Sequence, residues 1–222
     1  MELHQKITEN ENFAAALLAR AGVYISHDPL MDSKADQMIA GFRTQKEIYQ
    51  KVIELCSSSH SSLSEYLSVM AYSMLGEGYE DGVIRCAKEF LNTPSNWNSG
   101  NEEILIQDGI RKRRADLRRG EVLMAMATAE SQQSCYVSAL MHQKQAYALM
   151  PYSAEAVVRL SQILRHEAGV DAAVKFLQDQ RQSVFYPPFL YVDEEEKQKH
   201  NDAFSRGIES ELEKLKKESK ES

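Results

Sequence analysis

One helical pattern occurs twice in this chain, and the repetition constrains its fold more than any other feature. Residues 79–94 read YEDGVIRCAKEFLNTP and residues 136–151 read YVSALMHQKQAYALMP. Each copy starts with Tyr, has a small residue fourth and an aromatic residue twelfth, and ends with Pro. The small residue allows a second helix to approach closely, and the Pro cannot continue the helix. Such a unit cannot bury its apolar face alone, so the pattern predicts stacked pairs of helices.

The rest of the chain also has the apolar period of helices. Apolar residues recur at steps of three and four, whereas no stretch alternates apolar and polar residues for long enough to predict a sheet. We therefore expect an all-α fold with about nine helices. The expected helices span residues 12–24, 33–55 (capped by Asp32 or Ser33), 63–75, 79–91, 102–132, 136–150, 154–168, 170–180 and 194–222.

The pattern divides the chain into three segments. Residues 1–62 hold N-terminal helices that cap the stack or form a degenerate repeat, and residues 63–182 hold the helical hairpins. Residues 183–222 begin with an extended aromatic stretch, 185–191, and end in a charged helix. The aromatic stretch either caps the stack or occupies a groove in a second copy of the chain. The second alternative predicts a homodimer, which size-exclusion chromatography would detect.

Charge and cysteine content exclude several classes of function. The net charge of −7 argues against a general attraction to nucleic acid. Cys56, Cys86 and Cys135 form no CxxC pair, so we expect three small buried side chains, with neither a metal site nor a cofactor. Free cysteines suit a reducing compartment. The longest apolar run, residues 13–25, contains Arg20 and is too short to span a bilayer, so we expect a cytoplasmic protein with no membrane partner.

No motif in the sequence specifies a reaction. It contains no GxSxG nucleophile elbow, no GxGxxG or Walker-type loop, and no HExxH zinc motif. His142 and His166 are single helical histidines, a type that more often packs or faces solvent than binds metal. We therefore expect that the protein is not an enzyme. The alternative, an enzyme in an all-α scaffold, would need a polar pocket with converging His, Glu or Asp side chains.

The repeated segments resemble the tetratricopeptide repeat, whose unit of about 34 residues pairs two antiparallel helices. That family keeps a small residue on the second helix and a Pro just after it. Here these positions match twice, as Gly82 with Pro94 and Ala139 with Pro151, while a third unit lacks the Pro. The resemblance covers residues 63–180. It implies a right-handed stack of antiparallel hairpins, an α-solenoid.

The resemblance also implies where a partner would bind. In this family the first helices of successive repeats line a concave groove that holds a peptide, so the expected function is a non-catalytic interaction module or scaffold. The positions that would face this groove are Met124, Thr128, Arg159, Gln162 and His166. Arg159 falls where the chaperone-adaptor branch places an Arg for a peptide's terminal carboxylate. That branch also needs a Lys and an Asn, which have no matching pair here.

A run of basic residues supports an alternative function. Six of the nine residues from 111 to 119 are basic: Arg111, Lys112, Arg113, Arg114, Arg118 and Arg119. On a helix, residues 111, 114 and 118 share one face, and such a patch can meet phosphates or an acidic peptide. The alternative is thus a regulatory helical protein that contacts nucleic acid or an acidic partner. More often such a run is a solvated face that pairs with nearby acids.

Overall fold

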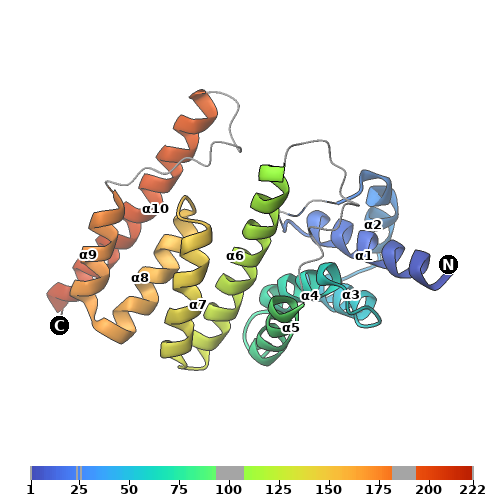
Figure 1. Cartoon of the computed structure of the whole chain (residues 1–222), viewed down its shortest axis with the longest axis horizontal. Helices are drawn as coiled ribbons and strands as arrows, with labels where there is room; N and C mark the ends of the chain where they lie inside the picture. Colours follow the sequence, from blue (N-terminus) through green and yellow to red (C-terminus); the bar gives the residue numbers. More distant parts are fainter. Residues whose placement is uncertain (1, 24, 26, 94–107, 182–193, 222) are drawn as a thin grey trace. The chain divides into compact units, whose positions relative to one another are not determined.

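The computed structural model describes residues 2–23, 25, 27–93, 108–181 and 194–221. These residues form ten α-helices and one 3₁₀ helix, and no strand occurs among them (Figure 1). The prediction of an all-α fold is therefore confirmed. None of the described helices is long and apolar enough to cross a membrane. The helices are α1 (Glu2–Arg20), η1 (Pro29–Met31), α2 (Asp32–Ile39), α3 (Gln45–Cys56), α4 (Ser62–Leu75), α5 (Glu80–Asn92), α6 (Asp108–Gln132), α7 (Tyr136–Leu149), α8 (Ala154–Ala168), α9 (Val170–Arg181) and α10 (Glu194–Glu221).

The chain forms two compact units, which we call the first unit (Met1–Ser95) and the second unit (Asn96–Ser222). In the first unit α1 contacts α2, α3 and α4, and α4 also contacts α3 and α5. Leu17, Val52 and Leu67, one from each of α1, α3 and α4, are fully buried. The core of the first unit therefore joins the N-terminal helices to the first copy of the repeated pattern.

The predicted segments 1–62, 63–182 and 183–222 follow other boundaries than the compact units. The boundary after residue 62 falls inside the first unit, because α4 packs on α1 and α3. The three segments describe repeats rather than compact units, and as such they remain a prediction. Residues 102–107, expected to be helical, and 185–191, expected to be extended, lie outside the described residues.

The prediction of a single helix from the cap at Asp32 or Ser33 to residue 55 is wrong, because the structure has a break between α2 and α3. Thr44 precedes α3 in an extended conformation (φ −140°, ψ 153°). The Glu47 carboxylate accepts hydrogen bonds from the Arg43 N–H (2.9 Å) and from the Thr44 hydroxyl (3.4 Å). A Thr followed three positions later by Glu marks a helix start. This local signal outweighs the continuous apolar period and adds a helix to the expected number.

The small residues of the repeated pattern lie where helices touch, as predicted. A Cβ atom added to Gly82 on α5 would lie 2.7 Å from the ring of Tyr72 on α4. Ala139 on α7 is fully buried and packs with Ala127 of α6 and Ile163 of α8. A larger side chain at either position would push the neighbouring helix away.

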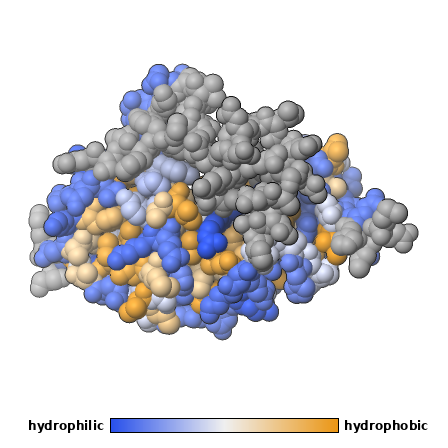
Figure 2. All heavy atoms as spheres, viewed as in Figure 1, coloured by the Kyte–Doolittle hydropathy of each residue, from blue (hydrophilic) through white to orange (hydrophobic). Residues whose placement is uncertain are grey.

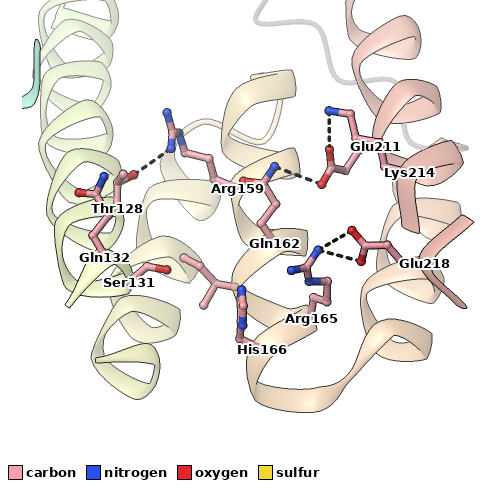
Figure 3. A pocket seen from close by; sticks show the side chains of 11 residues that line it. Thr128, Ser131, Gln132, Arg159, Gln162, Arg165, His166, Glu211, Lys214 and Glu218 are labelled. Atoms are coloured by element: carbon pink, nitrogen blue, oxygen red, sulfur yellow. Dashed lines mark hydrogen bonds and ion pairs between the residues drawn. The ribbon is translucent and has the colours of Figure 1, made fainter. Parts of the chain in front are cut away.

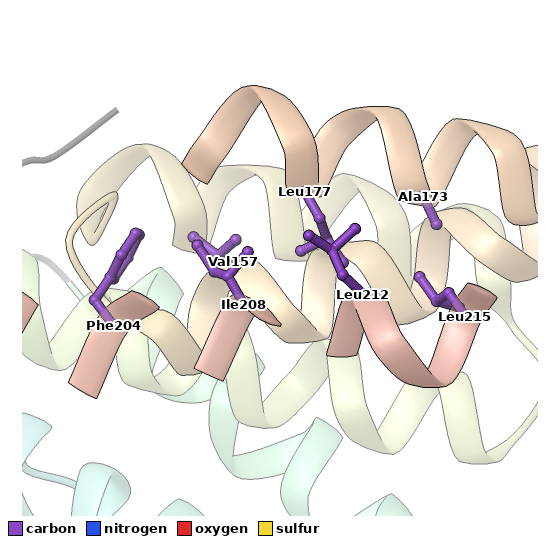
Figure 4. Close-up of a cluster of buried hydrophobic side chains, with 7 residues drawn as sticks. All are labelled: Val157, Ala173, Leu177, Phe204, Ile208, Leu212 and Leu215. Carbon is purple, nitrogen blue, oxygen red and sulfur yellow. The ribbon is translucent and has the colours of Figure 1, made fainter. Parts of the chain in front are cut away.

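The C-terminal helix α10 is part of the core of the second unit. Consecutive helices from α6 to α10 pack together, and α8 also contacts both α6 and α10. Burying each large aliphatic side chain contributes about 1.5–3 kcal/mol, so this packing holds α10 firmly despite its charged sequence. The buried cluster that joins α8, α9 and α10 consists of Val157, Ala173, Leu177, Phe204, Ile208, Leu212 and Leu215 (Figure 4).

Candidate functional site

Alternate helices of the second unit present side chains to one groove. Residues three or four apart share a face of a helix, and α6, α8 and α10 each contribute such a series. Because α8 lies between α6 and α10 and contacts both, it forms the floor between two walls (Figure 3). The series are Leu117, Glu121, Met124, Thr128 and Ser131 on α6; Glu155, Arg159, Gln162 and His166 on α8; and His200, Phe204, Glu211, Lys214 and Glu218 on α10.

The groove consists of two hollows of similar size. Over the second unit, Figure 2 shows hydrophilic and hydrophobic residues side by side. The polar hollow has a volume of about 390 Å³ and is lined by Thr128, Ser131, Gln132, Arg159, Gln162, Ile163, Arg165, His166, Glu211, Lys214 and Glu218 (Figure 3). The apolar hollow has a volume of about 360 Å³ and is lined by Leu117, Glu121, Met124, Met150, Tyr152, Ser153, Ala154, Glu155, His200, Ala203 and Phe204.

Arg159 contacts a lining residue of each hollow. Its Nε donates to Oε1 of Glu155, which lines the apolar hollow, at 3.1 Å. Its Nη1 donates to Oγ1 of Thr128 in the polar hollow, also at 3.1 Å. The Thr128 hydroxyl in turn donates to the carbonyl oxygen of Met124 at 2.9 Å. These contacts fix the guanidinium across the groove, although about a third of its side chain (37%) stays exposed.

The α10 wall is tied to the floor by two carboxylates. Glu211 is only 5% exposed, and it accepts hydrogen bonds from Nε2 of Gln162 (3.1 Å) and from Nζ of Lys214 (3.4 Å). Nη1 of Arg165 contacts both carboxylate oxygens of Glu218, at 2.9 and 2.8 Å (Figure 3). Partly exposed ion pairs such as Arg165–Glu218 contribute only about 0–1 kcal/mol to stability, so their main effect is to orient side chains.

His166 completes the polar hollow near the end of α8. Its ring stacks on Tyr136 of α7, with centroids 4.6 Å apart and planes 9° from parallel. The stack holds the imidazole in one orientation beside the polar side chains of α6. This histidine can donate or accept a hydrogen bond, whereas the neighbouring Arg165 can only donate.

The apolar hollow is built from flexible and aromatic side chains. Met124 of α6, Met150 after α7 and Phe204 of α10 line it, and Gly120 of α6 lies so close that a Cβ there would be 2.9 Å from the Met150 side chain. Nε2 of His200 lies 3.1 Å from the carbonyl oxygen of Tyr152. Methionines adapt their shape to different side chains. This hollow can therefore accept an apolar side chain of variable outline.

All five residues predicted to face a groove lie in this one. Thr128, Arg159, Gln162 and His166 line the polar hollow, and Met124 lines the apolar hollow. Their role in binding remains a prediction. The α10 wall was missed, because α10 lies outside the repeat resemblance. Its signal was present in the apolar residues Phe204, Ile208, Leu212 and Leu215, which recur at steps of three and four within a charged helix.

The basic run lies on the N-terminal part of α6. The backbone of residues 111–119 is helical, so the expected shared face for residues 111, 114 and 118 follows from the helical period. Arg119 is exposed. The side chains of residues 111–116 lie outside those that the structure describes, and the functional role of the run remains a prediction.

Two histidines outside the groove, His142 and His27, each lie against a carboxylate. Nδ1 of His142 lies 2.7 Å from Oε2 of Glu130, and Nε2 of His27 lies 2.8 Å from Oδ1 of Asp32. His60 lies in the serine-rich turn, where Ser61 caps α4 by accepting from the Ser64 N–H. Among the described residues, no group of three or more His, Cys, Asp or Glu side chains is arranged to hold a metal ion.

The cysteines differ from one another in exposure. Burial, with a smaller effect of the nearby Glu11 carboxylate, raises the pKa of the Cys56 thiol to about 12. Burial also raises the pKa of Cys86. The thiolate is the reactive form, so both side chains act as small apolar groups. The expectation of three buried cysteines is wrong for Cys135, which is exposed because it lies in the turn before α7.

Comparison with known proteins found no family model and no curated protein that matches this chain.

Proposed function

We propose that the second unit binds a peptide, or an exposed segment of a partner protein, in the groove between α6, α8 and α10. The observation that carries this proposal is the alignment of three helical series on one groove. A folded core needs no row of oriented polar groups beside an apolar hollow, whereas recognition of a peptide uses both. The protein would then act as a non-catalytic interaction module or scaffold.

The finer architecture belongs to the same proposal. The small residue and Pro of each copy, together with the packing of α8 on both α6 and α10, support a right-handed stack of antiparallel tetratricopeptide-like hairpins. In such a stack alternate helices face the same surface, as α6, α8 and α10 do here. Three unpaired cysteines in the sequence support a cytoplasmic location.

A peptide-display selection on the full chain tests the proposal. Peptides that bind the wild-type chain should bind Gln162→Ala and Arg159→Ala at least about tenfold more weakly, a loss of about 1.4 kcal/mol. Val137→Ala is the matched control, because Val137 is 76% exposed on α7 and lines neither hollow. Equal binding by all four proteins would reject the groove as the site.

The basic run motivates a second candidate function, a contact with nucleic acid or an acidic partner. It rests on six basic residues placed on one helix, three of them in register. Filter binding at low salt, with single- and double-stranded DNA and RNA, tests the nucleic-acid form. An unchanged signal after Arg114→Glu and Arg118→Glu would remove it.

A further inference from the structure

Resting on the proposed function, the charge pattern of the groove indicates which kind of peptide it takes. Three cationic side chains in the polar hollow each lie against a carboxylate of the same chain. Arg159 pairs with Glu155 at 3.1 Å, Arg165 with Glu218 at 2.8 Å, and Lys214 with Glu211 at 3.4 Å. The groove thus supplies its own counter-charges.

A ligand carboxylate that bound one of these cations would lie beside the carboxylate that already pairs with it. The two carboxylates would repel each other, since like charges disfavour each other at short range. Glu211 cannot move aside readily, because it is 5% exposed and is held by Gln162 and Lys214. A free amino terminus would likewise meet Arg159, Arg165 and Lys214. Neither end of a chain finds an uncommitted opposite charge in the polar hollow.

An uncharged main chain fits the same side chains without displacing them. Arg159 uses two N–H groups in its contacts, and a guanidinium has five, so it can also donate to a carbonyl oxygen. Ser131 and Gln132 line the polar hollow from α6, and each can both donate and accept hydrogen bonds. Every residue of an internal segment offers one N–H and one C=O, which these groups can pair.

The apolar hollow indicates the side chain that such a segment should carry. It is lined by Leu117, Met124, Met150 and Phe204. Its lining also includes Glu121 and Glu155, and Glu155 pairs with Arg159. The two carboxylates disfavour an acidic residue there. We infer that the groove binds an internal, uncharged peptide segment of a partner protein that places one large apolar side chain in the apolar hollow.

A peptide library that is displayed in two formats and selected for binding to the full chain tests this inference. A randomised peptide is displayed either between two folded domains, with no free end, or at a free carboxyl terminus. The internal format should enrich sequences that carry a large apolar residue among uncharged ones. A synthetic copy with acetylated and amidated ends should bind at least about tenfold more tightly than the same peptide with a free carboxylate. Its affinity should change less than about threefold between low and high salt, because no net charge is neutralised.

Groove variants separate the inference from the proposed function. Met124→Glu should abolish enrichment of apolar residues, whereas Met74→Glu, at a 48% exposed position on α4, should not alter it. Suppose that only peptides with a free carboxylate are enriched, and that this enrichment is lost in Arg159→Ala. The groove would then remain the binding site, but the inference of an internal, uncharged segment would be overturned. Enrichment in neither format, or enrichment unchanged by both Met124→Glu and Gln162→Ala, would overturn both. Circular dichroism identifies any variant that fails to fold, and Met124→Ala, which truncates the same lining side chain without adding a charge, then replaces Met124→Glu.

Discussion

The two compact units use their buried carboxylates differently. In the first unit, Glu11 accepts hydrogen bonds from Ser59 and Ser61, in the turn before α4, and Glu65 accepts one from Thr93 after α5. In the second unit, the buried Glu211 holds side chains along helix faces instead. A carboxylate that accepts hydrogen bonds within a turn does not orient side chains along the face of a helix. A carboxylate between two series of side chains orients a surface, as Glu211 does in the second unit.

The largest expected effects come from core truncations that test whether each unit has its own core. Leu67→Ala in the first unit and Ile208→Ala in the second each remove atoms from a fully buried side chain, which costs about 2–5 kcal/mol. Amide hydrogen exchange should accelerate only in the helices of the truncated unit. Leu30→Ala, at an 85% exposed position, should change stability by less than about 0.5 kcal/mol. Equal acceleration in both units would show that they unfold together.

Replacing a glycine in each unit should give a smaller difference in stability than the core truncations. A Cβ at Gly82 would lie 2.7 Å from the rigid Tyr72 ring, whereas a Cβ at Gly120 would lie 2.9 Å from the flexible Met150 side chain. Gly82→Ala should therefore destabilise the first unit by about 1–3 kcal/mol. Gly120→Ala should be close to neutral, because alanine favours helix by about 1 kcal/mol over glycine. Urea unfolding measures both, and a larger loss at Gly120 would contradict the assignment.

The buried Glu65 of the first unit should make stability depend on pH. Burial raises the pKa of Glu65 above its ordinary value, partly offset by the hydrogen bond from Thr93. The folded state therefore holds the Glu65 proton to higher pH than the unfolded state does, and stability falls as pH rises through the raised pKa. Glu65→Gln should stabilise the first unit at pH 7 and leave it nearly unchanged at pH 4. Thermal unfolding at both pH values checks this, with the exposed Glu54→Gln as control.

The smallest effect is expected for an ion pair of the groove. Arg165 and Glu218 are both partly exposed, so a double-mutant cycle on their alanine variants should give a coupling of about 0.2–1 kcal/mol. High salt should reduce the coupling. A coupling well above this range would mean that the pair holds α10 in place, which we assign to the buried cluster of α8, α9 and α10.

Local signals in the sequence predict most helices of both units. Ser61 and Ser153 cap α4 and α8 by accepting backbone hydrogen bonds, and Gly169 ends α8 with a φ of +86°. Each signal acts within a few residues, so it can be recognised without knowledge of the fold. The exception is the break before α3, where the equally local Thr44–Glu47 start signal interrupts a continuous apolar period.

The candidate groove could be predicted only in part. Its α6 and α8 residues follow from the repeat register, which assigns a face to each helix. The α10 wall does not, because its place depends on contacts between residues far apart in the chain, such as Leu177 with the α10 side chains of the same cluster. Of the three ion pairs in the groove, Arg165–Glu218 has the same origin, since these residues meet only after α10 has packed. The pairs Arg159–Glu155 and Lys214–Glu211 join residues four and three apart on one helix and are local.

The order of residues alone is enough for the helical class, most helix ends and the small residues at helix contacts, because hydrogen bonds and apolar period act over a few positions. Packing of distant helices decided which polar faces meet, that Arg165 pairs with Glu218, and where an apolar hollow opens. Those properties depend on long-range burial, which no local pattern encodes.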